Sequence, residues 1–449
     1  MNGPSENERG AARDTDVTAS TSGVSRRGLL KRAGGLALFG GTAAALTGCE
    51  DTTTPVAAYG AAGGGGKGIL GDPTAGGPVD ASGIPLARRD YPVVLPKLGT
   101  PVKAGKPESG GELLIYNYAD YLNPAVLKEF GRQNNVSVRV TTFETLDEAF
   151  SKLSTGGLKF DVIFSTPDQL SRLVGRRLVQ PLNYDLIPNL ARNVWPEAAQ
   201  PFYDVGPRYS VPYTVYTTGI GWRNDIVSYD PAKMNPVWDA MWAATQYHGK
   251  VQLLNDQREA IGMGLMHGGS DDLNTEKATL INASVASLKE LNRKVGVKVQ
   301  ISAYESLPAG RIVLGQVWSG DMLNAVISYL PKGTNPNVIS YAYQEVGGPV
   351  FNDIMTVASA ATKPVLAHKF LNFMLDKKVA LENFTGFVGY QPPINGIDAA
   401  LLLDQGLIPK GLQTALVTRE AYANGNAYLT LTTAGQRLWD DGWVRFQAG

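Results

Sequence analysis

The sequence predicts an α/β protein with a mainly parallel sheet, and two observations support this prediction. Between Leu113 and Val174, short apolar runs rich in β-forming residues alternate with helical patterns. This βαβαβα order is typical of a parallel sheet covered by helices on both faces. The chain also has 449 residues, of which 43% are hydrophobic. Since one hydrophobic core rarely serves a chain this long, we expect two lobes plus unstructured extensions.

The individual elements are predicted from local patterns. Leu113–Tyr116 has the pattern of a strand, and Asn123 precedes a helix over 124–133 that has proline in its first turn. The series continues with a strand over 136–142, a helix over 143–154, a buried strand over 161–164 and a helix over 168–174. Ligands of such sheets bind beyond the carboxyl ends of the strands, so the loops at 117–121 and 165–168 are predicted to line a site.

Charge, cysteine and histidine content exclude several classes of function. The chain has 41 basic and 41 acidic residues, so it lacks the basic excess that nucleic-acid binding requires. Its single cysteine, Cys49, excludes a disulfide framework, an iron–sulfur cluster and a thiolate zinc site. The three histidines, His248, His267 and His368, have no metal-binding spacing. We therefore expect no nucleic-acid partner, no metal and no cofactor.

Residues 1–48 have the pattern of an export signal. The pair Arg26 and Arg27 precedes a mildly apolar run over 33–45, which is too short to cross a bilayer as a stable helix. The Leu-Thr-Gly sequence before Cys49 resembles a bacterial lipobox. The pattern predicts a twin-arginine lipoprotein signal peptide and a lipid anchor on Cys49 at the outer face of the cytoplasmic membrane. Alternatively, this cysteine is an incidental small residue in an apolar segment.

Residues 49–110 are predicted to be a lipidated cysteine followed by a flexible tether. From Glu50 to about Gly110 there is no Trp, Phe or Met, and the segment includes four consecutive glycines and eight prolines. Such a segment cannot bury enough apolar surface to offset its ordering entropy. An alternative for its end is that residues 91–95 pack onto the body as a strand.

Several motifs occur in order along the folded body: Ile115–Tyr121, Phe160–Ile163, Tyr209–Tyr213, Thr218–Gly221 and Gly315–Asp321. From Glu112 to about Asn395, the ordered set resembles the periplasmic spermidine/putrescine-binding proteins of ABC importers. The resemblance implies a type II periplasmic-binding fold, with two α/β lobes that close on a ligand in the cleft between them. It implies lobe 1 at 111–219 and 319–358, and lobe 2 at 220–318 and 359–449.

Carboxylates and aromatic rings are what a polyamine receptor needs. Each desolvated ammonium requires an opposite charge, and aromatic faces attract both cations and CH groups. Asp256 and Glu259 are three residues apart at the start of a predicted helix, so their side chains face one way. The resemblance implies that they bind an amine. The same Asp-x-x-Glu spacing is also typical of a capping box, and both interpretations are open.

Two further acids are candidates by the same resemblance. Asp321 follows an apolar strand and precedes an apolar helix, where it could also act as an N-cap. Trp318, three residues before it, is predicted to form a flat wall of the site. Asp353 interrupts a hydrophobic run, and an acid in a half-buried strand either points to solvent or is retained for a cation.

The resemblance also implies a group of ligand-binding residues outside these acids. Tyr118 stands where relatives commonly have tryptophan and Tyr121 matches their tyrosine, so an aromatic floor is retained. Both tyrosines could instead pack against the helix at 124–133. The remaining candidates are Asp120, Thr166, Asp168 and Gln391.

These observations predict a binding protein and not an enzyme. The sequence has no Gly-x-Ser-x-Gly elbow, P-loop or histidine base, although an exported hydrolase that uses paired acids is an alternative. A second alternative is the same fold with ferric iron, a sugar or a peptide as ligand. Tyr341 and Tyr343 are close in sequence, but strand alternation explains their spacing. We expect a monomer that captures a polyamine by lobe closure and delivers it to the permease of an ABC importer.

Overall fold

The computed structural model of the protein describes residues 92–144, 146–154 and 159–449. The predicted export signal with Arg26 and Arg27, the predicted lipidation site Cys49 and the predicted tether up to residue 91 lie outside these ranges. What the sequence predicts for them remains a prediction.

The described residues form a sheet of nine strands. Their bounds are β1 (Glu112–Tyr118), β2 (Ser137–Phe143), β3 (Val162–Ser165), β4 (Val211–Arg223), β5 (Val251–Leu254), β6 (Lys298–Gln300), β7 (Leu314–Trp318), β8 (Ile339–Ala342) and β9 (Val350–Val357). The strand order is β2-β1-β3-β9-β4-β7-β5-β6, and β8 pairs with β4 beside this path. The first three predicted strands correspond to β1, β2 and β3.

Helices connect the strands. The α-helices are α1 (Pro124–Asn134), α2 (Leu146–Ser154), α3 (Pro167–Gly175), α4 (Pro188–Asn193), α5 (Pro196–Ala199), α6 (Asp239–Ala243), α7 (Gln257–His267), α8 (Ala278–Val295), α9 (Ala303–Ser306), α10 (Ser319–Asn324), α11 (Pro364–Met374), α12 (Lys377–Asn383), α13 (Ala399–Asp404), α14 (Arg419–Asn424) and α15 (Thr433–Gln447). Shorter 3-10 or π turns are η2 (Tyr184–Leu186), η3 (Pro231–Lys233), η4 (Ala244–Tyr247), η5 (Ala325–Tyr329), η6 (Pro336–Val338), η7 (Phe384–Val388) and η8 (Lys410–Ala415).

The predicted helices agree with α1, α2 and α3 except at one boundary. As predicted, α1 has proline at its first position, and the side chain of Asn123 caps it by accepting a hydrogen bond from the backbone N–H of Ala125. The helix expected to begin at Phe143 begins at Leu146 instead, because Phe143 is the last residue of β2.

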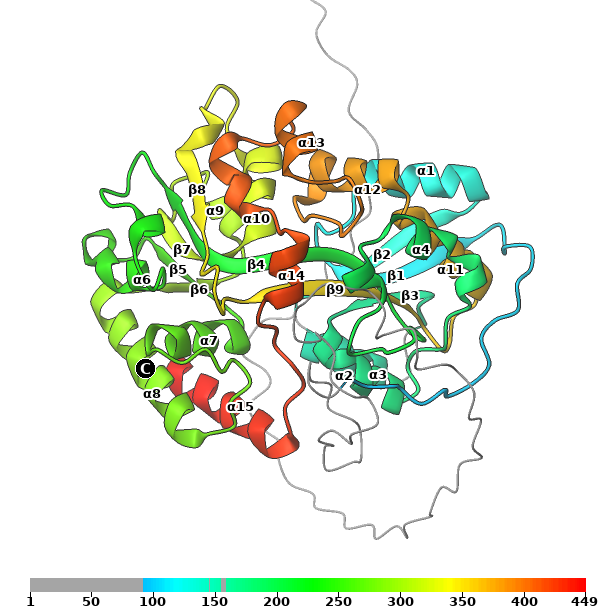
Figure 1. Cartoon of the computed structure of the whole chain (residues 1–449), viewed down its shortest axis with the longest axis horizontal. Helices are drawn as coiled ribbons and strands as arrows, with labels where there is room; N and C mark the ends of the chain where they lie inside the picture. Colours follow the sequence, from blue (N-terminus) through cyan, green and yellow to red (C-terminus); the bar gives the residue numbers. More distant parts are fainter. Residues whose placement is uncertain (1–91, 145, 155–158) are drawn as a thin grey trace, which may run out of the picture. The chain divides into compact units, whose positions relative to one another are not determined.

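β4 is the longest described strand and belongs to both parts of the sheet (Figure 1). Its first part, 211–217, pairs with β9, and its second part, 218–223, pairs with β7 and β8. A Cβ added at Gly219 would lie 2.3 Å from the carbonyl oxygen of Ala342 in β8. The glycine therefore permits this close pairing. One continuous strand thus links the part of the sheet that contains β1 to β3 with the part that contains β5 to β7.

The sheet is mixed, which corrects the prediction of a mainly parallel one. β1 pairs parallel with β2 and β3, and β5 pairs parallel with β6 and β7. Between these groups, β9 and β4 run antiparallel to their neighbours. Because β9 joins β3 from almost 190 residues further along the chain, the local βαβ pattern did not reveal it.

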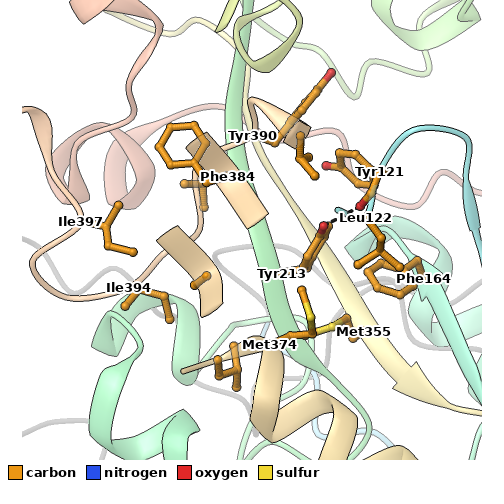
Figure 2. Close-up of a cluster of buried hydrophobic side chains, with 14 of the residues drawn as sticks. Tyr121, Leu122, Phe164, Tyr213, Met355, Met374, Phe384, Tyr390, Ile394 and Ile397 are labelled. Atoms are coloured by element: carbon orange, nitrogen blue, oxygen red, sulfur yellow. Dashed lines mark hydrogen bonds between the residues drawn. The ribbon is translucent and has the colours of Figure 1, made fainter. Parts of the chain in front are cut away.

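Three clusters of buried side chains hold the helices on the sheet. One packs α7, α8 and α15 against β5 and β7 around the fully buried Trp238 and Trp439. A second packs α2 and α3 against β1 around Tyr116. The third includes residues of α1, α10 and α11 together with the π turn η7, and Figure 2 shows the part of it in which Tyr121 and Tyr390 lie. This third cluster borders the candidate site.

Part of the segment 92–110 is packed onto the body, which agrees with the alternative given for the end of the predicted tether, except that no strand forms. Val93 and Leu95 are buried in the cluster that contains α2 and α3, and the backbone N–H of Val93 donates to the carbonyl of Phe202 at 2.8 Å. The Glu108 carboxylate accepts from backbone N–H groups at the start of α11. A few apolar residues with backbone partners therefore suffice to dock the segment, although it does not form a strand.

Two segments lie elsewhere than the predicted lobe boundaries place them. Residues 319–358 were assigned to lobe 1, yet β8 pairs with the second part of β4, beside β7. Residues 359–449 were assigned to lobe 2, yet α11 packs against β9 and α4. The bounds of the two lobes remain a prediction.

Candidate functional site

Three carboxylates from distant parts of the sequence are buried. Glu259 lies in α7, Asp321 in α10 and Asp353 in β9, and these residues are 4%, 3% and 4% exposed. In the part of the chain that the structure describes, none of them forms an ion pair with Lys, Arg or His. Since burial without a counterion disfavours the charged form, each would be stabilised by a cation.

Glu259 is held by three donors. The hydroxyl of Thr218 and the indole N–H of Trp318 donate to its Oε1 at 2.9 and 2.7 Å, and the hydroxyl of Tyr428 donates to its Oε2 at 3.3 Å. Thr218 and Trp318 are cross-strand partners in β4 and β7, so the sheet itself presents both donors. Burial, and next the charge of Asp256, raises the pKa of Glu259 to about 8 despite these hydrogen bonds.

Asp353 is held by two phenols. The hydroxyl of Tyr121 donates to its Oδ2 at 2.6 Å, and that of Tyr216 donates to its Oδ1 at 3.2 Å. Tyr121 follows β1 while Tyr216 lies in β4, which flanks β9. Burial raises the pKa of Asp353 to about 7, and the phenol hydrogen bonds offset only part of this effect.

Asp321 has the fewest partners of the three. Tyr390 donates from its hydroxyl to Oδ1 at 2.8 Å, whereas the buried Oδ2 atom has no hydrogen-bond partner. Burial raises the pKa of this carboxyl to about 7. A buried carboxylate oxygen that lacks a donor is costly, so an additional donor at Oδ2 would stabilise the ionised form.

Aromatic rings join the two aspartates. The rings of Tyr121 and Tyr390 meet edge to face with centroids 5.0 Å apart, and Tyr216 meets Tyr390 in the same way at 5.4 Å (Figure 2 shows the first pair). Each of these tyrosines also donates to Asp353 or Asp321. The two aspartates and the rings therefore form one continuous set that is built from β4, β9, α10 and the loops after β1 and η7.

The segment between α14 and α15 also contributes to the site. Besides its hydrogen bond to Glu259, Tyr428 stacks on Phe351 of β9 with ring centroids 4.8 Å apart. Two residues later, the hydroxyl of Thr430 donates to the backbone carbonyl of Asp168 at 2.6 Å. This segment connects α7 to the beginning of α3.

Comparison with known proteins identifies the family. The profile of the bacterial extracellular solute-binding proteins matches residues 125–405. The chain belongs to this family. It is 26% identical over 287 residues to the spermidine/putrescine-binding periplasmic protein 1 of Haemophilus influenzae, and the matched region covers 64% of this chain and 75% of that relative. It is also 26% identical over 294 residues to a putrescine/cadaverine-binding protein of Pseudomonas aeruginosa, and the matched region covers 65% of this chain and 81% of that relative.

Solved structures confirm the fold of this solute-binding protein. A spermidine/putrescine ABC transporter substrate-binding protein from Streptococcus pneumoniae has a TM-score of 0.60 at 22% identity, with 75% of this chain and 99% of that chain covered. The predicted type II periplasmic-binding fold and the resemblance drawn from the motifs are therefore confirmed. Proteins of this family bind solutes outside the cytoplasm and are not a class of enzymes.

Within the described ranges, none of the helices is both long and apolar enough to span a bilayer. Within the same ranges, no three His, Cys, Asp or Glu side chains are grouped as metal ligands would be.

The structure separates the roles of the Asp-x-x-Glu pair. The Asp256 side chain caps α7 by accepting from the backbone N–H groups of Arg258 and Glu259 at 2.8 and 3.0 Å. Glu259 does not complete a capping box, because its carboxylate points to Thr218 and Trp318. Asp256 nevertheless lies close enough for its charge to raise the pKa of Glu259, and its own pKa is raised by burial. A ligand contact by either residue stays a prediction.

Thr166 and Asp168 lie together before and in the first turn of α3. The Thr166 hydroxyl and the side-chain amide of Gln169 both donate to the Asp168 carboxylate, and all three residues are partly buried. The Asp168 charge contributes to the raised pKa values of Asp256 and Asp353, so these acids lie near one another. The loop after β3 thus lies near these acids, and a ligand contact by Thr166 or Asp168 stays a prediction.

Tyr118 and Asp120 lie at the edge of the site. Tyr118 is partly buried, and its ring packs against Phe143 and Tyr121 with centroids 4.5 and 5.8 Å away. Asp120 is exposed in the left-handed region, with φ of 52°. Its charge reaches Tyr304, whose pKa it helps to raise after burial and the charge of Asp321.

Gln391 is placed differently from the prediction. Its amide N–H groups donate to the carbonyl oxygens of Ile397 and Val417, and its Oε1 accepts from the backbone N–H of Val417. These bonds to a neighbouring loop use the polar atoms of the side chain. The preceding residue, Tyr390, is the one that contacts a site acid.

Sequence reasoning missed two aromatic residues of the candidate site, Tyr216 and Tyr428. Tyr216 lies between Thr214 and Thr218 in a run that reads as an ordinary strand, so no local signal set it apart. Tyr390 lies in the segment 389–392, which the sequence places at the rim of the site. Tyr428 lies in an irregular segment whose pattern gives no sign of the site.

Proposed function

We propose that this protein is the extracytoplasmic solute-binding component of an ABC importer and that its ligand is a polyamine of the putrescine/spermidine class. The observation that carries the proposal is the set of three buried carboxylates, Glu259, Asp321 and Asp353, without a described basic partner. The names of the relatives from Haemophilus influenzae and Pseudomonas aeruginosa agree with this ligand class.

The charge of the site favours a cation over other solutes. The three acids have pKa values near neutrality, so an anion in the site would be repelled by their ionised forms. The anion would also lose its hydration without gaining an opposite charge, and both effects oppose binding. A neutral sugar would leave the desolvation of the acids uncompensated. An ammonium offers both an opposite charge and N–H donors, and charge-assisted hydrogen bonds are among the strongest available.

The aromatic residues suit the rest of a polyamine. Tyr121, Tyr216 and Tyr390 lie between the acids, and their ring faces and edges can pack along the methylene groups that separate successive ammonium groups. Trp318 and Tyr428 do the same beside Glu259, to which both also donate hydrogen bonds. Acids and aromatic rings thus alternate along the site in the same way as ammonium groups and alkyl segments alternate along a polyamine.

The proposed mechanism is capture without chemistry. Lobe 1 would contribute Tyr121, Asp168 and Asp353 and lobe 2 would contribute Glu259, with β4 as one of the segments that connect them. A ligand that contacts both lobes binds the closed arrangement more tightly than the open one and so shifts the population toward closure. Closure would then create the surface that docks on the permease.

Export and anchoring complete the proposal. Arg26 and Arg27 would direct the chain to twin-arginine export, and lipidation of Cys49 would hold the monomer at the outer face of the cytoplasmic membrane.

Isothermal titration calorimetry of the purified protein at pH 8 tests the proposed ligand class. Putrescine, spermidine and spermine are the ligands, and at least one should bind at micromolar concentration or below. 1,4-Butanediol and 4-aminobutyrate are controls of similar chain length. The diol has neutral hydroxyls in place of both ammonium groups, and 4-aminobutyrate has a carboxylate in place of one; both should bind far more weakly. A folded protein that binds none of the three amines, or that binds the diol equally well, would defeat the proposal.

A further inference from the structure

A second buried polar side chain near Asp321 has no hydrogen-bond partner. Asn324 is 5% exposed, its Oδ1 atom is buried without a partner, and no described hydrogen bond involves its amide nitrogen. A buried amide oxygen without a hydrogen-bond donor destabilises the fold. The fold keeps this amide, so a donor or acceptor from outside the protein is the natural partner.

Asn324 and Asp321 lie on one face of α10. They are three residues apart in a helix, which places their side chains next to each other. Each has a buried oxygen without a donor, Oδ1 in Asn324 and Oδ2 in Asp321. The arrangement therefore offers two adjacent acceptors to one group that carries at least two N–H donors.

The surroundings hold α10 in place without using these oxygens. A Cβ added at Gly389 would lie 2.4 Å from the backbone nitrogen of Asn324, so the residue after η7 packs on the backbone of the helix. Directly after Asn324 the helix changes into the π turn η5, a feature common at functional sites. The ring of Tyr304, which packs on that of Tyr329 with centroids 5.2 Å apart, lies within reach of the Asp321 charge.

We propose that Asn324 is a ligand-binding residue and that, together with Asp321, it binds one ammonium group of the polyamine through two N–H···O hydrogen bonds. This inference rests on the proposed function. The pair selects an ammonium that retains at least two N–H donors, and it rejects a fully methylated one that carries the same charge. Asn324 thereby adds recognition of N–H groups to the charge recognition that Asp321 supplies.

The test compares Asn324→Leu with the wild type by calorimetry with putrescine and with its fully methylated analogue, 1,4-bis(trimethylammonio)butane. Leucine has a similar volume and no polar atoms. We expect the variant to bind putrescine about tenfold more weakly, as the loss of one hydrogen bond to a charged group implies. The preference for putrescine over the methylated analogue should shrink by the same factor.

Unfolding of the ligand-free protein supplies the second measurement. Because the Asn324 amide has no partner, the leucine variant should be at least as stable as the wild type. The matched control is Asn189→Leu: Asn189 is also buried, but its amide donates to the carbonyl of Asn372 at 2.9 Å. This control should lose stability and keep the wild-type selectivity. If Asn324→Leu does not fold, Asn324→Ala serves in its place.

The outcomes are distinguishable. A wild type that binds no polyamine overturns the proposed function and this inference with it. A wild type that binds putrescine while the Asn324 variant binds it equally well, with unchanged selectivity, overturns the inference alone and assigns the amide to water. A variant that loses stability like the control but keeps its selectivity also overturns it.

Discussion

The two ends of the acidic site differ in how much the protein itself stabilises a negative charge. At one end, Glu259 accepts from a threonine, an indole and a phenol. At the other, Asp321 accepts from a single phenol and has a buried oxygen without any donor. Both carboxyls are equally buried, so the difference lies in their partners and not in their exposure.

This difference assigns distinct tasks to the two acids. The donors of Glu259 come from β4, β7 and the segment before α15, so its carboxylate helps to hold these elements together. Asp321 contributes little to its surroundings, and the donor that it lacks is one that an ammonium supplies. Substitutions at the first end should therefore affect folding, and those at the second should affect binding.

Glu259→Ala should have the largest effect. It removes a buried side chain and leaves the Trp318 indole and the Thr218 hydroxyl without their acceptor, so the free energy of unfolding should fall by about 3 kcal/mol. Urea unfolding of the ligand-free protein measures this. Glu259→Gln, which retains one acceptor oxygen for the indole, is the matched control and should lose less. Equal stability of the alanine variant and the wild type would contradict a structural task for Glu259.

Asp321→Asn should weaken polyamine binding by about 2 kcal/mol or more, since a desolvated ammonium loses its charged partner. Its free energy of unfolding should stay the same or rise, because the substitution removes a buried charge that lacks a donor. Calorimetry with spermidine and urea unfolding measure the two quantities. Glu290→Gln, at a surface ion pair, is a control that should change neither. Unchanged affinity would remove Asp321 from the site.

Ligand-free stability should depend on pH in a direction set by burial. The pKa of Glu259 is raised to about 8 and those of Asp321 and Asp353 to about 7, all above their values in the unfolded chain. The folded protein therefore keeps protons that the unfolded chain has released. This stabilisation is complete below the unfolded pKa values and is lost as pH rises through 7 and 8. Thermal unfolding between pH 5 and 8.5 should show the decline.

Polyamine affinity should have the opposite pH dependence. The ligand needs ionised carboxylates, so its affinity should rise between pH 6 and 8, by up to about 1.4 kcal/mol per pH unit for each proton released. Calorimetry in buffers of different ionisation enthalpy counts these protons. An affinity that does not change over this range would mean that the three acids are already ionised or do not contact the ligand.

Two aromatic substitutions should have the smallest effects, and they compare the donors of Asp321 with those of Glu259. Tyr390→Phe removes the described donor of Asp321 and should weaken binding by about 1 kcal/mol, since the ionised carboxylate loses its one hydrogen bond from the protein. Trp318→Phe leaves Glu259 with two donors, Thr218 and Tyr428, and should have a smaller effect on affinity. Calorimetry with spermidine measures the loss of affinity in each variant. A larger loss in Trp318→Phe than in Tyr390→Phe would contradict the conclusion that Asp321 depends more on its single donor than Glu259 does on any one of its three.

The acids of the site could be predicted from sequence much better than their partners. Asp321 and Asp353 stand out because each interrupts an apolar run, and a charge in such a place is retained for a reason. Tyr216 and Tyr428 do not stand out, because a tyrosine in a strand or an irregular segment is ordinary. Their roles depend on pairings between segments more than 130 residues apart, which no local pattern encodes.

The fold, too, could be predicted only where its elements follow one another along the chain. Strands β1 to β3 and their helices follow one another along the chain, and periodicity and caps predicted them to within a few residues. The places of β9, β8 and α11 depend on long-range packing, so the lobe boundaries drawn in sequence order misplaced two of these segments. The docking of residues 92–95 was predicted only as an alternative, because two apolar residues in a Pro-rich stretch leave a weak signal.

A crystal structure of the protein with bound spermidine would show whether the three buried carboxylates hold the ligand. We expect an ammonium nitrogen within about 3 Å of Asp321 Oδ2, a second cationic group beside Glu259 or Asp353, and methylene groups against the tyrosine rings between them. A ligand bound elsewhere, or one whose ammonium groups contact none of these three carboxylates, would contradict this expectation.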